Sequence, residues 1–405
     1  MKVVQIKLSF ISRKFQKYSK IIMLMLMLML MLMLMLILIC FVCVLYDSLS
    51  GETKKPAYST EDLSKSQYKS EKIPVYQNRF GRTRPVVAVI GDNYMTELTD
   101  YVVPYGVLTR SKSAEVFAVG ISLTPISFYP ALKIFPQESI SSFDKKFSTG
   151  ADYVIVPAIH HSENPILLEW LNLQASKGAT IIGVCDGVWV LANAGLLKGK
   201  RATGFWYSLD DLEKKFKDTT WVRNRRYVVD QGIVTTTAVT ASIPVSLALV
   251  EAIAGKDRAF NVAVELGVQD WSPVHDSNRF RLTMSSVYTV VSNFLSFWSY
   301  EKIGIPVMAG VDEIKLALVA DAYSRTYRSQ AFSIAKSEET ILTSNGLRLI
   351  PDIVFGSTTS LSRILPVFDS TPAVITLDQT LLKIGEIYGR STADFVAIIL
   401  EYPYF

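Results

Sequence analysis

The chain has 405 residues, of which 49% are hydrophobic and 20% charged, and its net charge is +5 at pH 7. This length allows two domains, or one domain with an anchor and a smaller module. Residues 1–20 carry six Lys or Arg and no acidic residue, so the rest of the chain is close to neutral. This distribution gives no electrostatic basis for nucleic-acid binding, and we expect no nucleic-acid partner.

Residues 21–46 form an uncharged apolar run that is longer than the ~20 residues needed to cross a bilayer. No Ala-x-Ala-like cleavage site follows, which predicts an uncleaved transmembrane signal anchor, although cleavage stays open. The basic flank makes residues 1–20 a cytoplasmic tail. The expected location is therefore the cell membrane, in a single pass, with the later domains extracytoplasmic and the membrane as a partner through residues 21–46.

A flexible tether is expected over residues 47–84, which are rich in Ser, Lys, Glu and Gln. From Pro85 onward, short apolar runs alternate with helical patterns, as in a parallel sheet covered on both faces. The expected strands are 86–91, 114–120, 152–158 and 180–185, and the expected helices are 98–111, 165–178 and 187–197. A hairpin-like pair of strands within 227–238 and a helix at 244–255 follow.

The stretch TIIGVCDGVWVLANAGLLKGKRAT, residues 180–203, places a lone Cys185 between an apolar strand and a helix. Together with ADYVIVPA (151–158) and RRYVVDQGIVTTTAVTASIPVSLALVEAIAG (225–255), it resembles the ThiJ/PfpI family of class I glutamine amidotransferase-like domains. The similarity is closest to the ligand-sensing domain of AraC-type regulators. For residues 85–275 the resemblance implies an α/β fold: a three-layer, flavodoxin-like sandwich with a mostly parallel sheet, preceded here by the transmembrane helix.

The end of the chain repeats parts of this domain. Residues 114–137 align without gaps to 329–352, with apolar positions in register. We interpret residues 300–405 as a truncated, degenerate second ThiJ/PfpI-like copy that lacks the third strand, the elbow and the cysteine, and residues 276–299 as a connecting helix. Because family members often dimerise, the two copies are expected to pack as an intrachain pseudo-dimer, with a homodimer as the alternative.

The strand-to-helix turn at Cys185 predicts a nucleophile elbow. At such a turn the sulfur is exposed, and the N-terminus of the following helix makes the thiol more acidic than the ~8.5 of a free cysteine. Asp186 and Gly187 open that helix, and backbone N–H groups there can receive an oxyanion. The resemblance implies that Cys185 is the reactive cysteine and that Asp100 is the acid on the first helix.

A nucleophile also needs a base, and the chain has three histidines. Phe205 stands where some family members place a histidine, and Asp186 stands where the peptidase-type members do. His160 and His161 follow the third strand, next to Ala158, and are the candidate substitute bases. The candidate catalytic residues are thus Cys185, Asp100, His160 and His161, and the candidate ligand-binding residues are Ala158, Asp186 and Gly187. The spacing matches no strong metal signature, so we expect no metal and no cofactor.

These observations favour a membrane-anchored small-molecule-binding or sensory and regulatory domain with an eroded catalytic set. A cysteine-dependent amidase, hydrolase or glyoxalase-type enzyme using Cys185 is the alternative, and whether the chain is an enzyme stays open. A structural or interaction module is the third hypothesis, because the second copy is degenerate.

Overall fold

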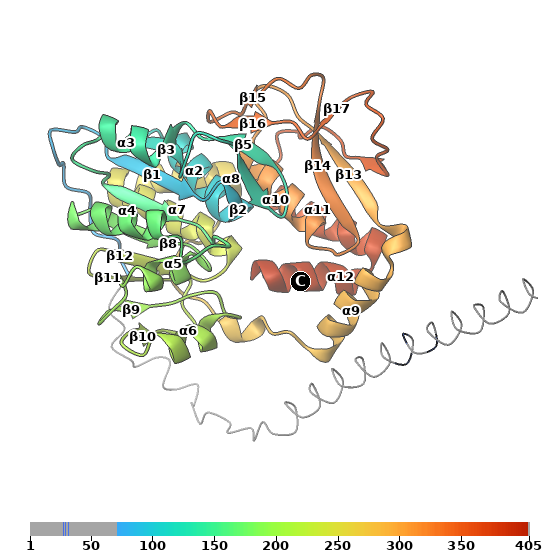
Figure 1. The fold of residues 1–405 in the computed structure, drawn as a ribbon, viewed down its shortest axis with the longest axis horizontal. Helices are drawn as coiled ribbons and strands as arrows, with labels where there is room; N and C mark the ends of the chain where they lie inside the picture. The colour runs from blue at the N-terminus through green and yellow to red at the C-terminus, as the bar shows by residue number, and fades with distance from the viewer. Residues whose placement is uncertain (1–26, 28, 30, 32–70, 404–405) are drawn as a thin grey trace, which may run out of the picture. The chain divides into compact units, whose positions relative to one another are not determined.

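The computed structural model describes residues 71–403 together with Met27, Met29 and Met31. Its centre is a seven-stranded sheet in the order β11-β12-β8-β7-β1-β3-β6 (Figure 1). All neighbouring strands are parallel except β11 and β12. The strands are β1 Val86–Gly91, β3 Glu115–Gly120, β6 Glu138–Ser139, β7 Tyr153–Val156, β8 Thr180–Gly183, β11 Tyr227–Asp230 and β12 Ile233–Thr236.

Both faces of this sheet are covered because its strands are apolar at successive positions. In β1, Val87 and Val89 belong to one buried cluster, and Val86, Ala88 and Ile90 belong to the other. Successive side chains of a strand point to opposite faces, so the continuous run fills two cores. The first cluster includes α2 Leu98–Ser111, α7 Ser242–Ala254 and α8 Lys256–Leu266 and extends into the helices after residue 300. The helices of the second are α3 Ile140–Lys146, α4 Pro165–Ser176, α5 Gly187–Asn193 and α6 Leu209–Lys215.

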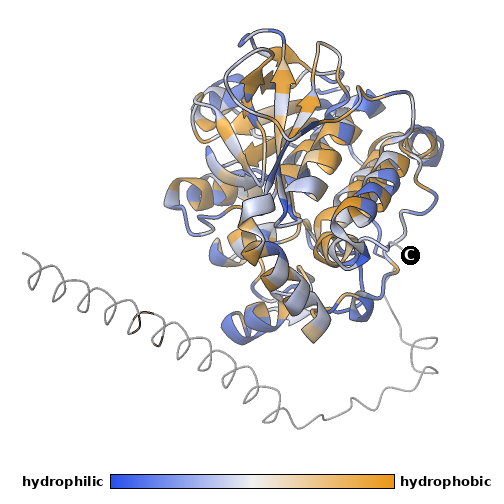
Figure 2. Ribbon diagram, turned by 90° about the vertical axis from the view of Figure 1, so that its right-hand side faces the viewer, coloured by the Kyte–Doolittle hydropathy of each residue, from blue (hydrophilic) through white to orange (hydrophobic). Residues whose placement is uncertain are grey.

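The α/β part of the expected fold is therefore confirmed, and several predicted elements agree with the observed ones to within a few residues. The strand at 86–91 and the helix at 98–111 have the predicted bounds. In Figure 2 the central strands are mainly hydrophobic, and hydrophilic residues gather on turns and outer helix faces. This is the pattern expected of a sheet buried on both sides.

The expected transmembrane helix before the domain is wrong, and so is the expected single-pass membrane location. Among the described residues no helix is long and apolar enough to cross a membrane. A spanning helix needs about 20 residues, and the longest described helix, α11 Ala373–Tyr388, has 16. Residues 21–46 lie outside the described residues apart from Met27, Met29 and Met31, as do the tail and most of the tether.

A five-stranded sheet joins the two ends of the described chain, in the order β15-β16-β5-β4-β2. Residues 300–403 also form a parallel sheet in the order β17-β14-β13-β18, flanked by helices. The remaining elements of these two sheets and the helices around them are β2 Tyr94–Glu97, β4 Ile126–Tyr129, β5 Lys133–Phe135, β13 Glu301–Pro306, β14 Ser329–Ala335, β15 Ile341–Leu342, β16 Arg348–Ile350, β17 Ile353–Val354, β18 Arg363–Ile364, α10 Glu313–Ser324 and α12 Arg390–Leu400. A small separate sheet pairs β9 Arg201–Ala202 with β10 Thr220–Trp221.

The two hairpins of the shared sheet have the same register. In β4 and β5, Ile126 pairs with Ile134; adding 215 to both numbers gives Ile341 and Leu349, which pair in β15 and β16. Between the hairpins, Ile134 pairs with Leu349, its own counterpart. Contacts in which residue i meets j and j meets i are typical of a two-fold, isologous interface. That residues 300–405 are a second copy stays a prediction.

One part of that prediction is wrong, because residues 300–405 do contain a short third strand. β18 pairs in parallel with β13, as β7 pairs with β1. This strand has only two residues, Arg363 and Ile364, which are too few to show the apolar pattern of a strand in the sequence. Pairing with a neighbouring strand supplies the hydrogen bonds that define it, and this is a tertiary contact.

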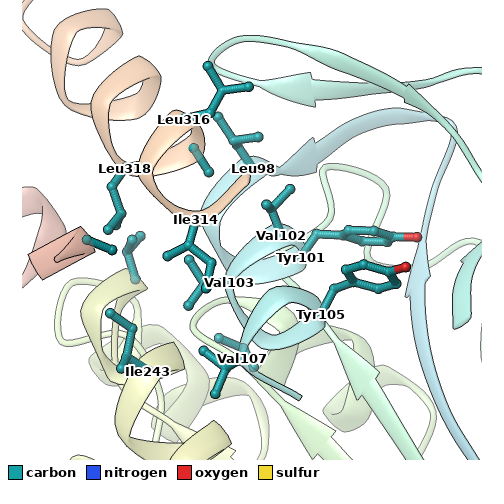
Figure 3. Close-up of a cluster of buried hydrophobic side chains, with 14 of the residues drawn as sticks. Leu98, Tyr101, Val102, Val103, Tyr105, Val107, Ile243, Ile314, Leu316 and Leu318 are labelled. Carbon is teal, nitrogen blue, oxygen red and sulfur yellow. The ribbon is translucent and has the colours of Figure 1, made fainter. Parts of the chain in front are cut away.

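Helix α2 lies between the two ends of the chain, packed against both α7 and α10. Figure 3 shows Val103 and Val107 of α2 beside Ile314 of α10 and Ile243 of α7. A Cβ built on Gly106 would lie 2.7 Å from Cγ1 of Ile314, so the absence of a side chain lets α2 and α10 approach closely. This first cluster therefore contains side chains from both ends of the described chain.

Candidate functional site

Cys185 lies at the end of β8 on the expected sharp turn. Its φ is +54°, in the left-handed region that non-glycine residues seldom adopt. The Cys185 backbone N–H donates to Oγ1 of Thr236 over 3.2 Å, which ties the turn to β12. A Cβ on Gly187 would lie 2.1 Å from the carbonyl oxygen of Val156, so only glycine fits at the start of α5. The local sequence thus builds an elbow.

The Cys185 side chain is buried, contrary to the expected exposure, with 6% of its surface accessible. Asp100, on the first turn of α2, is fully buried, and its Oδ2 accepts a hydrogen bond from the Ala158 backbone N–H over 3.2 Å. The other oxygen, Oδ1, is buried without a hydrogen-bond partner, as is Oδ1 of Asp186. Three of the predicted site residues therefore share one enclosed region with Cys185: Asp100, Ala158 and Asp186.

Two further acids and one cation belong to this region, and the sequence analysis missed them. Glu97, directly before α2, is buried and forms an ion pair with Arg325, which follows α10. Arg325 Nε also lies 2.8 Å from Oδ1 of Asp321, which is fully buried. Glu97 and Asp100 stand three residues apart on one helical turn, a pattern visible in the sequence. Arg325 is 228 residues from Glu97, and only the tertiary fold brings them together.

Burial opposes the ionisation of these acids, whereas the guanidinium of Arg325 favours the charged form of Glu97. Burial raises the pKa of Asp100 well above its ordinary value, and the nearby Glu97 raises it further. Burial also raises the pKa of Glu97 to about 8 and that of Asp186 to about 6. A low-dielectric environment disfavours the charged form of a carboxyl group. Burial therefore favours the protonated form of Asp100, which can donate a hydrogen bond.

The thiol is less acidic than a free cysteine, and the prediction of an acidic thiol is wrong. Burial raises the pKa of Cys185 well above its ordinary value, and the carboxyl groups of Asp100, Asp186 and Glu97 add to the increase. The N-terminus of α5 favours a thiolate, but desolvation and three neighbouring acids outweigh it. Cys185 is thus a protonated thiol at neutral pH.

Neither candidate base contacts Cys185 in the structure. His160 and His161 are exposed and lie against each other, with ring centroids 5.1 Å apart. His161 stacks on Tyr94 and its Nδ1 lies 3.9 Å from Oδ2 of Asp92. The chain passes Ala158 at the enclosed site and then runs outward, because the His160 backbone N–H is bonded to the carbonyl of Met95. This loop therefore carries both imidazoles toward the surface.

His275 has a different role that the sequence did not suggest. Its Nε2 lies 2.7 Å from Oε1 of Glu401, a buried residue directly after α12. Oε2 of Glu401 accepts from the Ala238 backbone N–H over 2.9 Å. Phe205, at the family's histidine position, packs against the buried core beside Trp206. In the part of the chain that the structure describes, no group of three or more potential ligands is placed to hold a metal ion.

Residues 85–252 match the model of the DJ-1/PfpI family. These residues form a DJ-1/PfpI family domain. The elbow at Cys185 and the acid on α2 both lie inside it. The described residues from 253 onward lie beyond the match; Arg325 among them contacts Glu97, and Glu401 accepts a hydrogen bond from Ala238.

Curated relatives of the DJ-1/PfpI domain include a regulator and an enzyme. The HTH-type transcriptional regulator CdhR of Pseudomonas aeruginosa is 30% identical over 118 residues, which are 29% of this chain and 35% of the regulator. The isonitrile hydratase of Pseudomonas putida is 29% identical over 172 residues, 40% of this chain and 70% of the enzyme. The chain thus spans about a third of the length of the regulator.

Solved structures resemble part of the chain at lower identity. The DJ-1beta of Drosophila melanogaster is 22% identical with a TM-score of 0.42, covering 46% of this chain and all of that one. An AraC family transcriptional regulator from Pseudomonas putida is 17% identical with a TM-score of 0.39, covering 45% of this chain and 98% of that one.

Proposed function

We propose that the DJ-1/PfpI domain is a small-molecule-binding or sensory and regulatory module whose cysteine does not catalyse turnover. The observation that carries this proposal is the burial of Cys185, with 6% of its surface accessible, beside the carboxyl groups of Asp100, Asp186 and Glu97. Nucleophilic catalysis needs a thiolate and a base to generate it. Burial keeps the thiol protonated, and the two loop histidines point to other partners. The similarity to a transcriptional regulator over 118 residues supports a regulatory role.

The first prediction concerns thiol reactivity. We expect iodoacetamide to modify Cys185 in the folded chain at pH 7.5 at least ~10-fold more slowly than in urea, because only the accessible thiolate reacts. Peptide mapping by mass spectrometry separates Cys185 from Cys40 and Cys43, and the Cys185→Ala variant checks the peptide assignment. Modification of Cys185 at the same rate in folded and unfolded chains would contradict the buried, protonated thiol.

The same pair of proteins tests the function. Wild type and Cys185→Ala should show equal background rates on amide, ester, α-oxoaldehyde and isonitrile substrates, and a small molecule that binds should raise the melting temperature of both. General-base help is typically worth about 10²–10⁴-fold, so a working catalytic set would stand out clearly. A rate that depends on Cys185 and on His160 or His161 would overturn the proposal.

A cysteine-dependent enzyme is the second candidate, and the left-handed backbone of Cys185 favours it. Strain of this kind costs about 1–3 kcal/mol and clusters at active sites. Asp100 would act as the proton donor, since burial favours its protonated form and one of its oxygens has no partner. The similarity to isonitrile hydratase over 172 residues adds to this candidate. The rate comparison above distinguishes the two functions.

We further propose that residues 300–405 are a truncated second copy that takes the place of a partner subunit. The sheet order β17-β14-β13-β18 corresponds to β6-β3-β1-β7, and the hairpin registers differ by a constant 215. The ion pairs follow the same two-fold pattern: Arg325 after α10 meets Glu97 before α2, and Arg110 of α2 meets Asp312 before α10. One chain would then contain both sides of the interface.

A truncation tests this proposal. We expect a chain ending at Ser299 to self-associate, because the face of α2 that α10 covers in the intact chain is apolar (Figure 3). Restoring residues 300–405 as a separate chain should reverse the association. Light scattering measures the mass of each sample. A truncated chain that stays a folded monomer would show that this face needs no partner.

A further inference from the structure

Helix α9, Met284–Leu295, has an unusual distribution of side chains. Its buried residues are polar: Ser286, Thr289 and Asn293. Its apolar residues are exposed at the helical spacing i, i+3, i+4, i+7, i+10 and i+11, and these are Met284, Val287, Tyr288, Val291, Phe294 and Leu295. A helix on the surface of a single domain normally buries its apolar side. In α9 the apolar side faces solvent and the polar side faces the protein.

Polar contacts fix α9 in this orientation. Asn293 Nδ2 donates to the carbonyl oxygen of Thr326 over 2.9 Å and to Oγ1 of Thr392, on α12, over 3.0 Å. A capping box between Thr283 and Ser286 fixes the start of the helix. Figure 1 shows α9 beside α12 at the edge of the ribbon. Turning α9 to bury its apolar side would break these buried hydrogen bonds.

The exposed apolar surface continues past the end of α9. Phe297, Trp298 and Tyr300 are exposed by 73, 76 and 46%. Together with the six side chains of α9 they form the α9 face. Five of these nine side chains are aromatic. Aromatic side chains carry about 150–250 Å² each, so the nine together present on the order of 1,000 Å² to solvent. The largest apolar patch of a typical monomer is about 300–600 Å².

We propose that the α9 face is the contact between two copies of this chain in a two-fold symmetric dimer. Its area exceeds the ~800 Å² per partner that a standard interface buries. Residues 282–300 contain no Asp, Glu, Lys or Arg, so a face-to-face pairing of identical copies places no like charges opposite each other within the patch. An uncharged patch also offers no electrostatic attraction to an acidic or basic partner. The proposal is independent of the function proposed for the cysteine.

The test measures the mass of the full-length chain by sedimentation. We expect twice the 45.2 kDa of one chain. The double variant Val291→Asp with Phe294→Asp should lower it to one chain, since it places two charges at the centre of each face. The control, Phe260→Asp, changes an exposed apolar residue of α8 and should leave the dimer intact. Circular dichroism should match wild type in both.

Cross-linking locates the contact in the same preparation. We expect Val291→Cys to give a disulfide-linked dimer on mild oxidation, whereas the exposed Leu123→Cys should not exceed the background from the native cysteines. A wild-type monomer, a dimer unaffected by the double variant, or equal cross-linking at both positions would overturn the proposal. So would binding to phosphatidylcholine–phosphatidylglycerol vesicles that the double variant abolishes, because the face would then contact lipid.

Discussion

Replacing Arg325 by Met should destabilise the protein by about 3–5 kcal/mol. Arg325 contacts Glu97 and Asp321, and no more than 11% of any of the three side chains is accessible. Removing the cation leaves two buried carboxyl groups without their partner, which is far more costly than the net value of an ion pair. Denaturant unfolding followed by tryptophan fluorescence measures the loss of free energy.

The chain offers a matched control for this variant. Arg110 pairs with Asp312 at the other end of the same two helices, but 17 and 19% of these side chains are accessible. Arg110→Met should therefore cost only about 1 kcal/mol. Adding Glu97→Gln to Arg325→Met should recover part of the loss, because a neutral amide replaces the unpaired acid. Equal losses from Arg325→Met and Arg110→Met would contradict the buried network.

Asp186→Asn should make the protein more stable than wild type as the pH rises from 4 to 7, by up to about 3 kcal/mol. Burial raises the pKa of Asp186 from its ordinary 3.8 to about 6 in the folded chain. Between these two values the folded chain holds a proton that the unfolded chain has released. The contribution of this protonated carboxyl group to the stability of wild type is therefore complete below pH 3.8, and it is lost as the pH rises through 6. Each unit of pKa difference is worth 1.36 kcal/mol.

The measurement is the difference in unfolding free energy between variant and wild type at a series of pH values. Asp211→Asn, on the exposed side of α6, is the control and should leave the pH dependence unchanged. For Asp100→Asn the divergence should begin at the same pH and continue to higher pH, because the pKa of Asp100 is raised well above its ordinary value in the folded chain. If Asp186→Asn changes stability by the same amount at pH 4 and pH 7, the acid is not buried in the folded chain.

The sequence by itself determined the sheet and the elbow, because both depend on neighbouring residues. Val86 to Gly91 is apolar at every position and forms a strand buried on both faces. Cys185 and Gly187 stand at a strand-to-helix junction. At position 187 the carbonyl oxygen of Val156 is so close that only glycine fits. The order of strands and helices then follows from the rule that parallel strands are connected through helices.

Only the tertiary structure decided the chemistry of Cys185. Helix position alone predicts an acidic thiol, but burial and the acids of α2 reverse the direction of its pKa shift. The position of the loop histidines likewise follows from hydrogen bonds between distant segments, such as that of His160 with Met95. Arg325 reaches Glu97 across 228 residues through the packing of α10 on α2. Protonation depends on every charge within a few ångströms, whatever its distance along the chain, and the sequence order does not contain those distances.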